Sequence, residues 1–262
     1  MSFGERIEIK SRSEIQQMRD VGQKTAEILL ELRESARPGI TTQQLDDLAA
    51  KGLEKRGLNS PFLGYAPGGV APYPAVLCAS VNDEIVHGIP GPRELQEGDI
   101  ISLDFGVELG GWHGDTAVTV AVGNVTSEAE KLIATTHEAM EQGIEKMVPG
   151  NRLSDIGHAV EKRALKESYG VVHQFVGHGI GKEMHEPPQV PNYGRPGRGP
   201  RLRPGMIFAI EPMVNIGSDK VKVLKDEWTA VTVDGSLSAH FEHTVLITDN
   251  GPEVLTRITG SH

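Results

Sequence analysis

Carboxylate side chains recur at matching places in two parts of this chain, inside segments that are otherwise apolar. The ten residues that end at Asp104, LQEGDIISLD, align without gaps with the ten that end at Glu211, LRPGMIFAIE. A second acid follows each of them on a later apolar segment, Asp115 in the first case and Glu242 in the second. Carboxylates buried together repel one another and lose their hydration, so they need a counter-charge. A divalent cation supplies that charge, and we predict a binuclear metal centre at a pseudo-twofold axis.

Imidazole side chains accompany both groups of acids. A His-Gly-Ile tripeptide precedes each aligned segment, with His87 before the first and His178 before the second. Four carboxylates with one histidine form a hard, oxygen-rich donor set that favours Mn(II), Fe(II) or Co(II), with zinc left open. A pair of such ions about 3.5–4 Å apart clamps a bridging hydroxide and polarises a carbonyl group. Hydrolysis is the reaction that this chemistry predicts.

A shared proton is the main alternative to metal for the first two acids. Asp104 lies on one predicted strand and Asp115 on the strand that returns from it. A two-residue turn at Leu109-Gly110 would place the two acids directly opposite each other, where like charges repel. One proton shared as in an acid dyad would relieve that repulsion. It would, however, leave His178 and the two later acids without a role, and any one acid alone is more simply an ordinary surface residue.

The elements that must position these side chains also occur twice. Helical spacing of apolar residues predicts four helices, two ahead of each group of strands, at about 13–38, 41–57, 127–149 and 151–170. Three of them begin with a capping-box pattern, at 13–16, 41–44 and 127–130. A repeat this long predicts a duplicated fold, because solenoid repeats are only about 20–50 residues long. We expect one catalytic domain over 1–262, with halves at about 13–123 and 127–250.

Composition excludes several classes of protein. The 262 residues show no composition break that would mark a linker, and no apolar run long enough to cross a bilayer. We expect no membrane association, no signal peptide and a cytoplasmic location. The single cysteine, Cys78, excludes disulfides within the chain and cysteine-rich zinc sites. The net charge of −10 argues against specific nucleic-acid binding, and the arginine-rich loop 193–203 is better explained as a solvated loop than as a phosphate site.

At these acids and histidines the chain resembles the type I methionine aminopeptidases, a family of metallopeptidases with the pita-bread fold. The resemblance covers essentially the full length of the chain. Besides Asp104 and Asp115, it rests on VHGIP at 86–90, GHGIG at 177–181, HEP at 185–187, IEP at 210–212 and EHT at 242–244. It implies an α+β fold in which pseudo-twofold duplicated helices pack on a curved antiparallel sheet.

The resemblance also assigns roles to individual residues. It implies two divalent metal ions held by Asp104, Asp115, His178, Glu211 and Glu242, with Asp115 and Glu242 bridging both ions. His87 is expected to face the substrate, and His185 to stabilise the oxyanion that forms at the scissile amide. Glu211 is expected to move a proton from the attacking water to the leaving amine.

An apolar pocket beside the metals is the remaining part of the resemblance. It is expected to be lined by Tyr65, Cys78, Trp228, Phe62, Tyr73 and Met184. Met184 departs from the family pattern, in which an aromatic residue often precedes the second catalytic histidine, and the loop 66–72 looks longer than in compact bacterial relatives. For Cys78 we prefer the role of a small apolar residue to that of a catalytic thiol.

The function implied is removal of the N-terminal initiator methionine from nascent proteins with a small second residue, by attack of a metal-bridged hydroxide on the scissile carbonyl. The partners would be nascent N-termini at the ribosome, and we expect a monomer. The absence of a long insertion between Glu211 and Glu242 disfavours the type II enzymes. Two alternatives stay open: an exopeptidase of the same fold that prefers a proline-containing bond, and a catalytically silent module that acts as a protein-binding scaffold.

Overall fold

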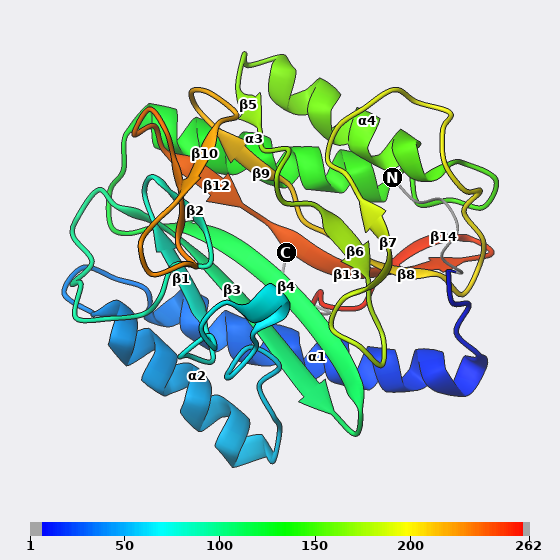
Figure 1. Ribbon diagram of the computed structural model, residues 1–262, viewed down its shortest axis with the longest axis horizontal. Helices are drawn as coiled ribbons and strands as arrows, with labels where there is room; N and C mark the ends of the chain where they lie inside the picture. The colour runs from blue at the N-terminus through cyan, green and yellow to red at the C-terminus, as the bar shows by residue number, and fades with distance from the viewer. Residues whose placement is uncertain (1–6, 259–262) are drawn as a thin grey trace.

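Four α-helices and an eight-stranded antiparallel sheet dominate the computed structural model, which describes residues 7–258 (Figure 1). The helices are α1 Arg12–Ser35, α2 Thr42–Arg56, α3 Ser127–Ile144 and α4 Leu153–Leu165, and a short 3₁₀ turn, η1, spans Pro67–Gly69. None of the helices in this described range is long and apolar enough to cross a membrane.

Capping side chains decide where these helices begin. α2 begins as predicted, because the hydroxyl of Thr41 accepts the backbone N–H of Gln44 at 3.1 Å, and the helix ends at Gly57 with a φ of 63°. α1 begins earlier than predicted, because Ser11 rather than Ser13 is the capping residue. The cap of α3 likewise lies one residue before the predicted position, and α4 is shorter than predicted at both ends. A capping side chain accepts one of the backbone N–H groups in the first turn that have no partner within the helix. The residue whose side chain does so therefore marks where the helix begins.

The large sheet brings the two groups of acids together. Its strand order is β1-β3-β4-β13-β8-β6-β7, with β14 paired to the outer part of β13. The strands are β1 Cys78–Val81, β3 Ile100–Leu109, β4 Trp112–Ala121, β6 Gly177–Gly179, β7 Glu186–Val190, β8 Ile207–Ile210, β13 Glu242–Thr248 and β14 Gly251–Val254. β13 lies between β4 and β8 and therefore joins the early strands to the late ones.

Two three-stranded sheets flank the large one. The first has the order β10-β11-β2, with β2 Glu84–Val86, β10 Val221–Val223 and β11 Ala230–Thr232. The second has the order β12-β9-β5, with β5 Gly170–Val171, β9 Met213–Asn215 and β12 Ser238–His240. β2 and β12 lead directly into the segments that carry His87 and Glu242, so these small sheets fix where those side chains enter the site.

The helix pairs lie on opposite sides of the molecule, and the strands run between them (Figure 1). α1 packs on β3 and β4, and α3 contacts β8, β9 and β12 as well as β4. Fully buried side chains, including Phe105 on β3 and Phe208 on β8, anchor the two main apolar clusters. Burial of each such side chain contributes roughly 1.5–3 kcal/mol, so the strands that carry the acids rest on a well-packed base.

The β3–β4 turn corrects one prediction from the sequence. Gly110-Gly111 forms the turn, with φ angles of 60° and 82°, one residue later than predicted. Asp104 therefore lies opposite Ala117, and Asp115 lies opposite Gly106, so the prediction that the two acids oppose each other directly was wrong. They still share one face of the sheet, because side chains two residues apart on a strand point the same way.

Candidate metal and peptide-binding site

One cavity of about 260 Å³ is lined by all the residues that the sequence predicted to bind metal or substrate or to act in catalysis. The predicted residues in its wall are Phe62, Tyr65, Tyr73, Cys78, His87, Asp104, Asp115, His178, Met184, His185, Glu211, Trp228 and Glu242. Five further residues that were not predicted also line it: Pro67, Val86, Phe175, Val176 and His240. Acids and histidines therefore share a single chamber with a set of apolar and aromatic side chains.

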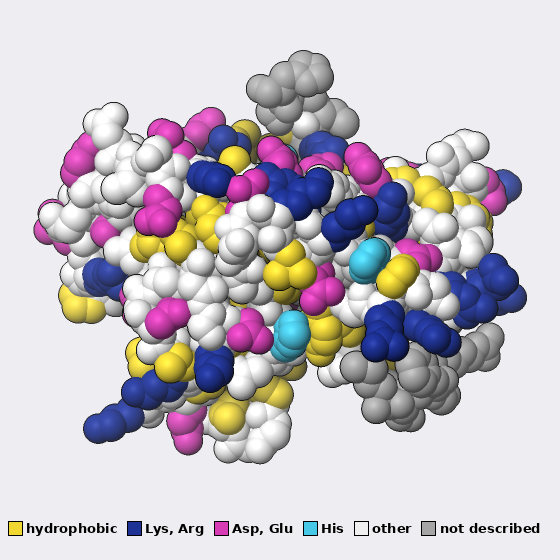
Figure 2. Space-filling model, turned by 90° about the horizontal axis from the view of Figure 1, so that it is seen from above, with side chains coloured by type: hydrophobic (Ala, Val, Ile, Leu, Met, Phe, Trp, Pro, Cys, Tyr) yellow, Lys and Arg dark blue, Asp and Glu magenta, His cyan; other side chains and the backbone are white. Residues whose placement is uncertain are grey.

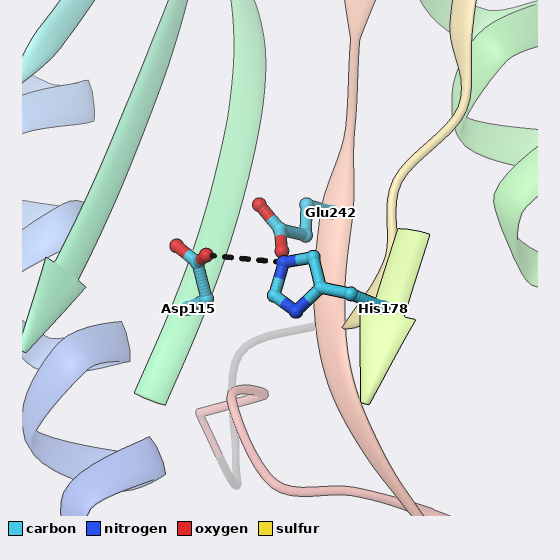
Figure 3. A group of neighbouring side chains, drawn as sticks. All are labelled: Asp115, His178 and Glu242. Carbon is cyan, nitrogen blue, oxygen red and sulfur yellow. Dashed lines mark ion pairs between the residues drawn. The ribbon is translucent and has the colours of Figure 1, made fainter. Parts of the chain in front are cut away.

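The acids come from neighbouring strands of the large sheet. Asp104 lies on β3, Asp115 on β4, Glu242 at the start of β13, and Glu211 directly after β8. Asp115, Glu242 and His178 each offer one ligand atom, and these atoms all lie within 4.8 Å of one another (Figure 3). The Nε2 of His178 also lies 3.3 Å from a carboxylate oxygen of Glu211.

Threonine side chains hold β4 and β13 together at the site. The hydroxyl of Thr244 accepts the backbone N–H of Asp115 at 3.1 Å and donates to the carbonyl of the same residue at 2.8 Å. The hydroxyl of Thr116 donates to the carbonyl of Glu242 at 2.8 Å. These bonds fix Asp115 and Glu242 relative to each other from the backbone, which leaves both carboxyl groups free to face the cavity.

Burial and mutual repulsion dominate the electrostatics of the acids. Burial raises the pKa of Asp104 to about 7, and burial with the charge of Asp104 raises the pKa of Asp115 well above its ordinary value. The pKa of Glu211 and that of Glu242 are also raised, first by burial and then by the neighbouring acids. No Lys or Arg within residues 7–258 forms an ion pair with any of the four. A cluster of this kind holds its charge only if a cation neutralises it.

Unpartnered oxygen atoms give an independent test of whether the residues fit a metal ion. One carboxylate oxygen each of Asp104, Asp115 and Glu242 is buried without any hydrogen-bond partner. Buried polar atoms are almost always satisfied, so each exception requires a reason. An oxygen-rich set with one imidazole suits a divalent cation, and the residues present therefore fit one.

The imidazole of His178 is already oriented toward the acids. Its Nδ1–H donates to the carbonyl of Gly179 at 2.8 Å, which leaves the lone pair on Nε2 facing Asp115 and Glu211. Burial, followed by the charge of His185, lowers the pKa of His178 to about 3, so the ring is neutral at ordinary pH. A neutral ring with a free Nε2 is the form that binds metal.

His87 sits on a strained turn in the cavity wall, where its ring meets those of Phe175 and Trp228 edge-on. Its φ is 61°, an uncommon value for a residue with a side chain, and Gly88 follows it. A Cβ atom at Gly88 would lie 2.5 Å from the carbonyl oxygen of Ala79, so only glycine fits there. Strain of this kind concentrates at functional positions. Burial, with a further contribution from His185, lowers the pKa of His87 to about 4.

His185 lies at the exposed end of the cavity, between His178 and Tyr65. Its ring centre is 4.4 Å from that of His178 and 5.4 Å from that of Tyr65, which stacks on it. The Nδ1 of His185 lies 3.1 Å from the hydroxyl of Tyr65. Burial and the charge of His113 lower its pKa. The ring is thus held between His178 and the exposed rim of the cavity.

The apolar side of the cavity is built around Trp228. Its indole N–H donates to the carbonyl of Ala71 at 2.8 Å, and its ring meets that of Tyr73 edge-on at 5.1 Å. The hydroxyl of Tyr73 donates to backbone carbonyls, which fixes this wall. Cys78 is buried beside it, and burial with the charge of Asp104 raises the pKa of its thiol well above the ordinary value. A thiol held in its neutral form behaves as an apolar lining group.

His240 is the unpredicted residue that bears most on the site. It is 1% exposed, and neither of its ring nitrogens has a hydrogen-bond partner in the described structure. It stands two residues before Glu242, so alternation along an extended segment puts both side chains on the same face. That spacing was the one signal in the sequence that pointed to it. Phe175, which meets His87 edge-on at 5.3 Å, had no comparable signal.

The arginine-rich loop 193–203 lies outside this cavity, against α4. The backbone of Gly197 donates to Asp155 at 2.6 Å and that of Arg198 to Ser154 at 2.7 Å, and the four arginine side chains of the loop are exposed. Seen from above, the molecule presents Lys and Arg interspersed with Asp and Glu (Figure 2). The exposure of the four arginine side chains fits the prediction of a solvated loop.

The sequence of this chain matches those of known metallopeptidases. The model of metallopeptidase family M24 matches residues 16–249. The chain belongs to metallopeptidase family M24. A methionine aminopeptidase of Clostridium acetobutylicum is 53% identical to this M24 chain, over 95% of its length and 98% of the relative's. The resemblance to methionine aminopeptidases that the motifs indicated is therefore confirmed.

Solved structures of related proteins have the same fold as this chain. The crystal structure of a methionine aminopeptidase from Thermotoga maritima superposes with a TM-score of 0.92 at 44% identity, covering 97% of this chain and all of that one, 100%. This match confirms the predicted α+β pita-bread fold. A prolidase from Pyrococcus horikoshii superposes at a TM-score of 0.76 with 20% identity, and the alignment covers only 63% of it. That second likeness shows a shared fold alone.

Proposed function

We propose that this protein is a metal-dependent aminopeptidase that removes methionine from the N-terminus of polypeptides whose second residue is small. The observation that carries the proposal is the cluster of four acids with His178, without any basic partner in the described chain, next to an apolar chamber. The methionine aminopeptidases that are close relatives support the same activity.

The metal ligands would be Asp104, Asp115, His178, Glu211 and Glu242. We propose two ions, with Asp115 and Glu242 shared between them, drawn from Mn(II), Fe(II), Co(II) or Zn(II). The donor set favours the first three, because carboxylate oxygens predominate. When bound, divalent cations supply the positive charge that polarises the scissile carbonyl and lowers the pKa of water.

The protein's own side chains would complete the reaction. His185 would donate a hydrogen bond to the oxygen on which negative charge develops, and Tyr65 at 3.1 Å would keep its ring in place. Glu211 would accept the proton of the attacking water and deliver it to the leaving amine. His87 would hold the peptide from the other wall of the cavity.

The apolar chamber would hold the methionine side chain. Trp228, Tyr73, Phe62, Cys78 and Met184 form its wall, with Tyr65 at the rim. Aromatic and sulfur-containing side chains suit a flexible thioether. Beyond the scissile bond, the hydrogen-bonded Tyr65 and His185 would leave little room, which favours a small second residue.

We propose further that nascent polypeptides emerging from ribosomes are the natural substrates and that the enzyme works in the cytoplasm as a monomer. One catalytic domain over 1–262, with halves at about 13–123 and 127–250, would supply the site jointly. The first half would contribute Asp104 and Asp115, and the second half would contribute His178, Glu211 and Glu242. The shared position of β13 between β4 and β8 supports this division.

The test is an anaerobic assay of the chelated protein with Met-Ala-Ser, after separate re-addition of Mn, Fe, Co and Zn. We expect no turnover without metal and release of methionine when a divalent ion is restored. Ala-Pro-Ala serves as the control substrate, because preferential cleavage of it would support the proline-specific alternative. Absence of both turnover and stoichiometric metal binding would support the silent scaffold and overturn the proposal.

A further inference from the structure

A buried lysine from outside the cavity reaches the loop that carries His185. Lys10 lies just before α1, and its side chain is only 1% exposed. Its ammonium group is 2.6 Å from a carboxylate oxygen of Glu186, the residue that directly follows His185. A second acid, Glu8, lies 2.5 Å from the same ammonium group, but its side chain is half exposed. The buried ion pair is therefore the one with Glu186.

Glu186 uses its other oxygen to shape the loop between β6 and β7. That oxygen accepts the backbone N–H of Lys182 at 2.8 Å and that of Glu183 at 3.4 Å. The loop runs from His178 on β6 to Glu186 at the start of β7, and it carries both Met184 and His185. Lys10 thus holds the carboxylate that closes the loop on which His185 stands.

Main-chain contacts fix the position of Lys10 itself. Its backbone N–H donates to the carbonyl of Gly205 at 2.8 Å, and Gly205 donates to the carbonyl of Ile247 on β13 at 2.8 Å. A Cβ atom at Gly205 would lie 2.7 Å from the side chain of Ile9. The segment that carries Ile9 and Lys10 therefore packs so closely on Gly205 that only glycine fits there. The ammonium group of Lys10 also lies 5.9 Å from the ring centre of Trp112. The segment is therefore braced against the same sheet that holds the acids.

Close packing around this ion pair makes the local structure sensitive to replacement of either partner. A Cβ atom at Gly181 would lie 2.5 Å from both the ammonium group of Lys10 and a carboxylate oxygen of Glu186, so little space surrounds the pair. Removal of Lys10 leaves Glu186 charged without a basic partner, and removal of the Glu186 charge leaves Lys10 with only the half-exposed Glu8; the local structure then rearranges to rehydrate the charge that remains. The segment that such a rearrangement reaches first is the loop 180–185, because Glu186 accepts the backbone N–H groups of Lys182 and Glu183 within it.

We propose that Lys10 is a positioning residue that acts through Glu186 to hold His185 where it meets the scissile amide. The inference rests on the proposed aminopeptidase function and adds a residue to it that touches neither substrate nor metal. Displacement of a catalytic group by about 1 Å can reduce turnover about 10²-fold. Loss of the Lys10–Glu186 ion pair is therefore expected to lower the rate of turnover rather than to weaken substrate binding.

The test compares the purified full chain with Lys10→Met, Glu186→Gln and the control Lys182→Met. Lys182 belongs to the same loop and faces Glu14 on α1 at 3.9 Å, but its side chain is 61% exposed. Turnover of Met-Ala-Ser, metal content by elemental analysis and the midpoint of thermal unfolding are measured for each. We expect Lys10→Met and Glu186→Gln to lower kcat by about 10- to 100-fold with KM and metal content close to those of the unmodified protein. Lys182→Met should stay within about twofold, as expected for an exposed pair.

A second comparison separates positioning from general destabilisation. In a His185→Ala background, assayed at raised enzyme concentration, Lys10→Met should reduce the residual kcat by less than about twofold, because residues that act as one unit are not additive. A kcat for Lys10→Met within about twofold of the unmodified protein, or an equal fractional loss in both backgrounds, overturns the inference. If Lys10→Met does not fold, the same two criteria apply to Glu186→Gln. Failure of the unmodified, metal-restored protein to release methionine would instead overturn the proposed function.

Discussion

Replacement of Glu242 by glutamine tests the electrostatic basis of the site without changing its shape. Glu242 is 2% exposed, and one of its oxygens lacks any partner. Its carboxyl group and those around it repel one another: two unit charges 4.8 Å apart, the span of the ligand group, interact by about 3 kcal/mol at an effective dielectric of about 20. Glutamine removes that repulsion and keeps a hydrogen bond to Asp115.

Two opposite effects on stability follow from this substitution. Without metal, Glu242→Gln should be at least as stable as the unmodified protein, with up to about 3 kcal/mol gained, less whatever bound protons already relieve. With metal at about 100 times its Kd, the unmodified protein should gain about 2.7 kcal/mol, or roughly 5–10 °C in Tm, whereas the variant should gain far less. Turnover of Met-Ala-Ser should be lost in the variant.

Thermal unfolding in chelator and in added Mn(II) measures both effects. Glu253→Gln is the matched control, because Glu253 pairs with Arg19 at the surface, far from the cavity wall, and its variant should keep the full response to metal. The reasoning is refuted if metal-free Glu242→Gln is less stable by more than about 2 kcal/mol, the size of an unsatisfied buried polar group. It is equally refuted if metal raises the Tm of the variant as much as that of the unmodified protein.

Three other substitutions probe separate parts of the structure. His87→Ala should lower kcat by about 10²-fold while elemental analysis finds the metal content unchanged, since His87 faces the substrate; loss of metal would contradict that role. Gly88→Ala should lower the free energy of unfolding in urea by about 1–3 kcal/mol, because its Cβ would meet the carbonyl of Ala79 at 2.5 Å; a neutral effect would show that the turn can relax. The backbone N–H of Ser218, followed by the groups of Ser236, lowers the pKa of Asp234 from 3.8 to about 2. The stabilisation by Asp234 is therefore complete above pH 3.8 and disappears as the pH falls toward 2, so urea midpoints of Asp234→Asn should fall less steeply than those of the unmodified protein across this range; parallel curves would argue against it.

The paired acids could be predicted from the sequence because the duplication repeats them in register. Asp104 and Glu211 end aligned apolar segments. Side chains alternate between the two faces of a strand, so acids at matching positions of two such segments are expected on matching faces of the sheet. The turn could not be placed from the same pattern. The common two-residue hairpin turns need positive φ at the first position, and type I′ needs it at both; Gly110-Gly111 satisfies this requirement, whereas Leu109-Gly110 would place a leucine at the first position. Turn chemistry, rather than apolar alternation, fixed the register.

Contacts between distant residues that lie outside the repeated segments could not be predicted from the sequence. Lys10 and Glu186 are separated by 176 residues, and neither belongs to an apolar pattern or to the aligned segments. His240 was missed for a related reason: a single polar residue ahead of a strand is usually a surface residue, and only the curvature of the chain into the cavity buries it. Periodicity predicts which face a residue occupies, and it does not predict what packs against that face.

The central place of β13 has a consequence for the order in which the protein matures. Synthesis delivers β4 and β8 well before β13, yet β13 must lie between them (Figure 1). Until residues 242–248 have left the ribosome, the growing chain holds two separated sheet fragments and lacks Glu242 altogether. A truncated or still-tethered polypeptide in which β13 has not yet paired with β4 and β8 should therefore be inert.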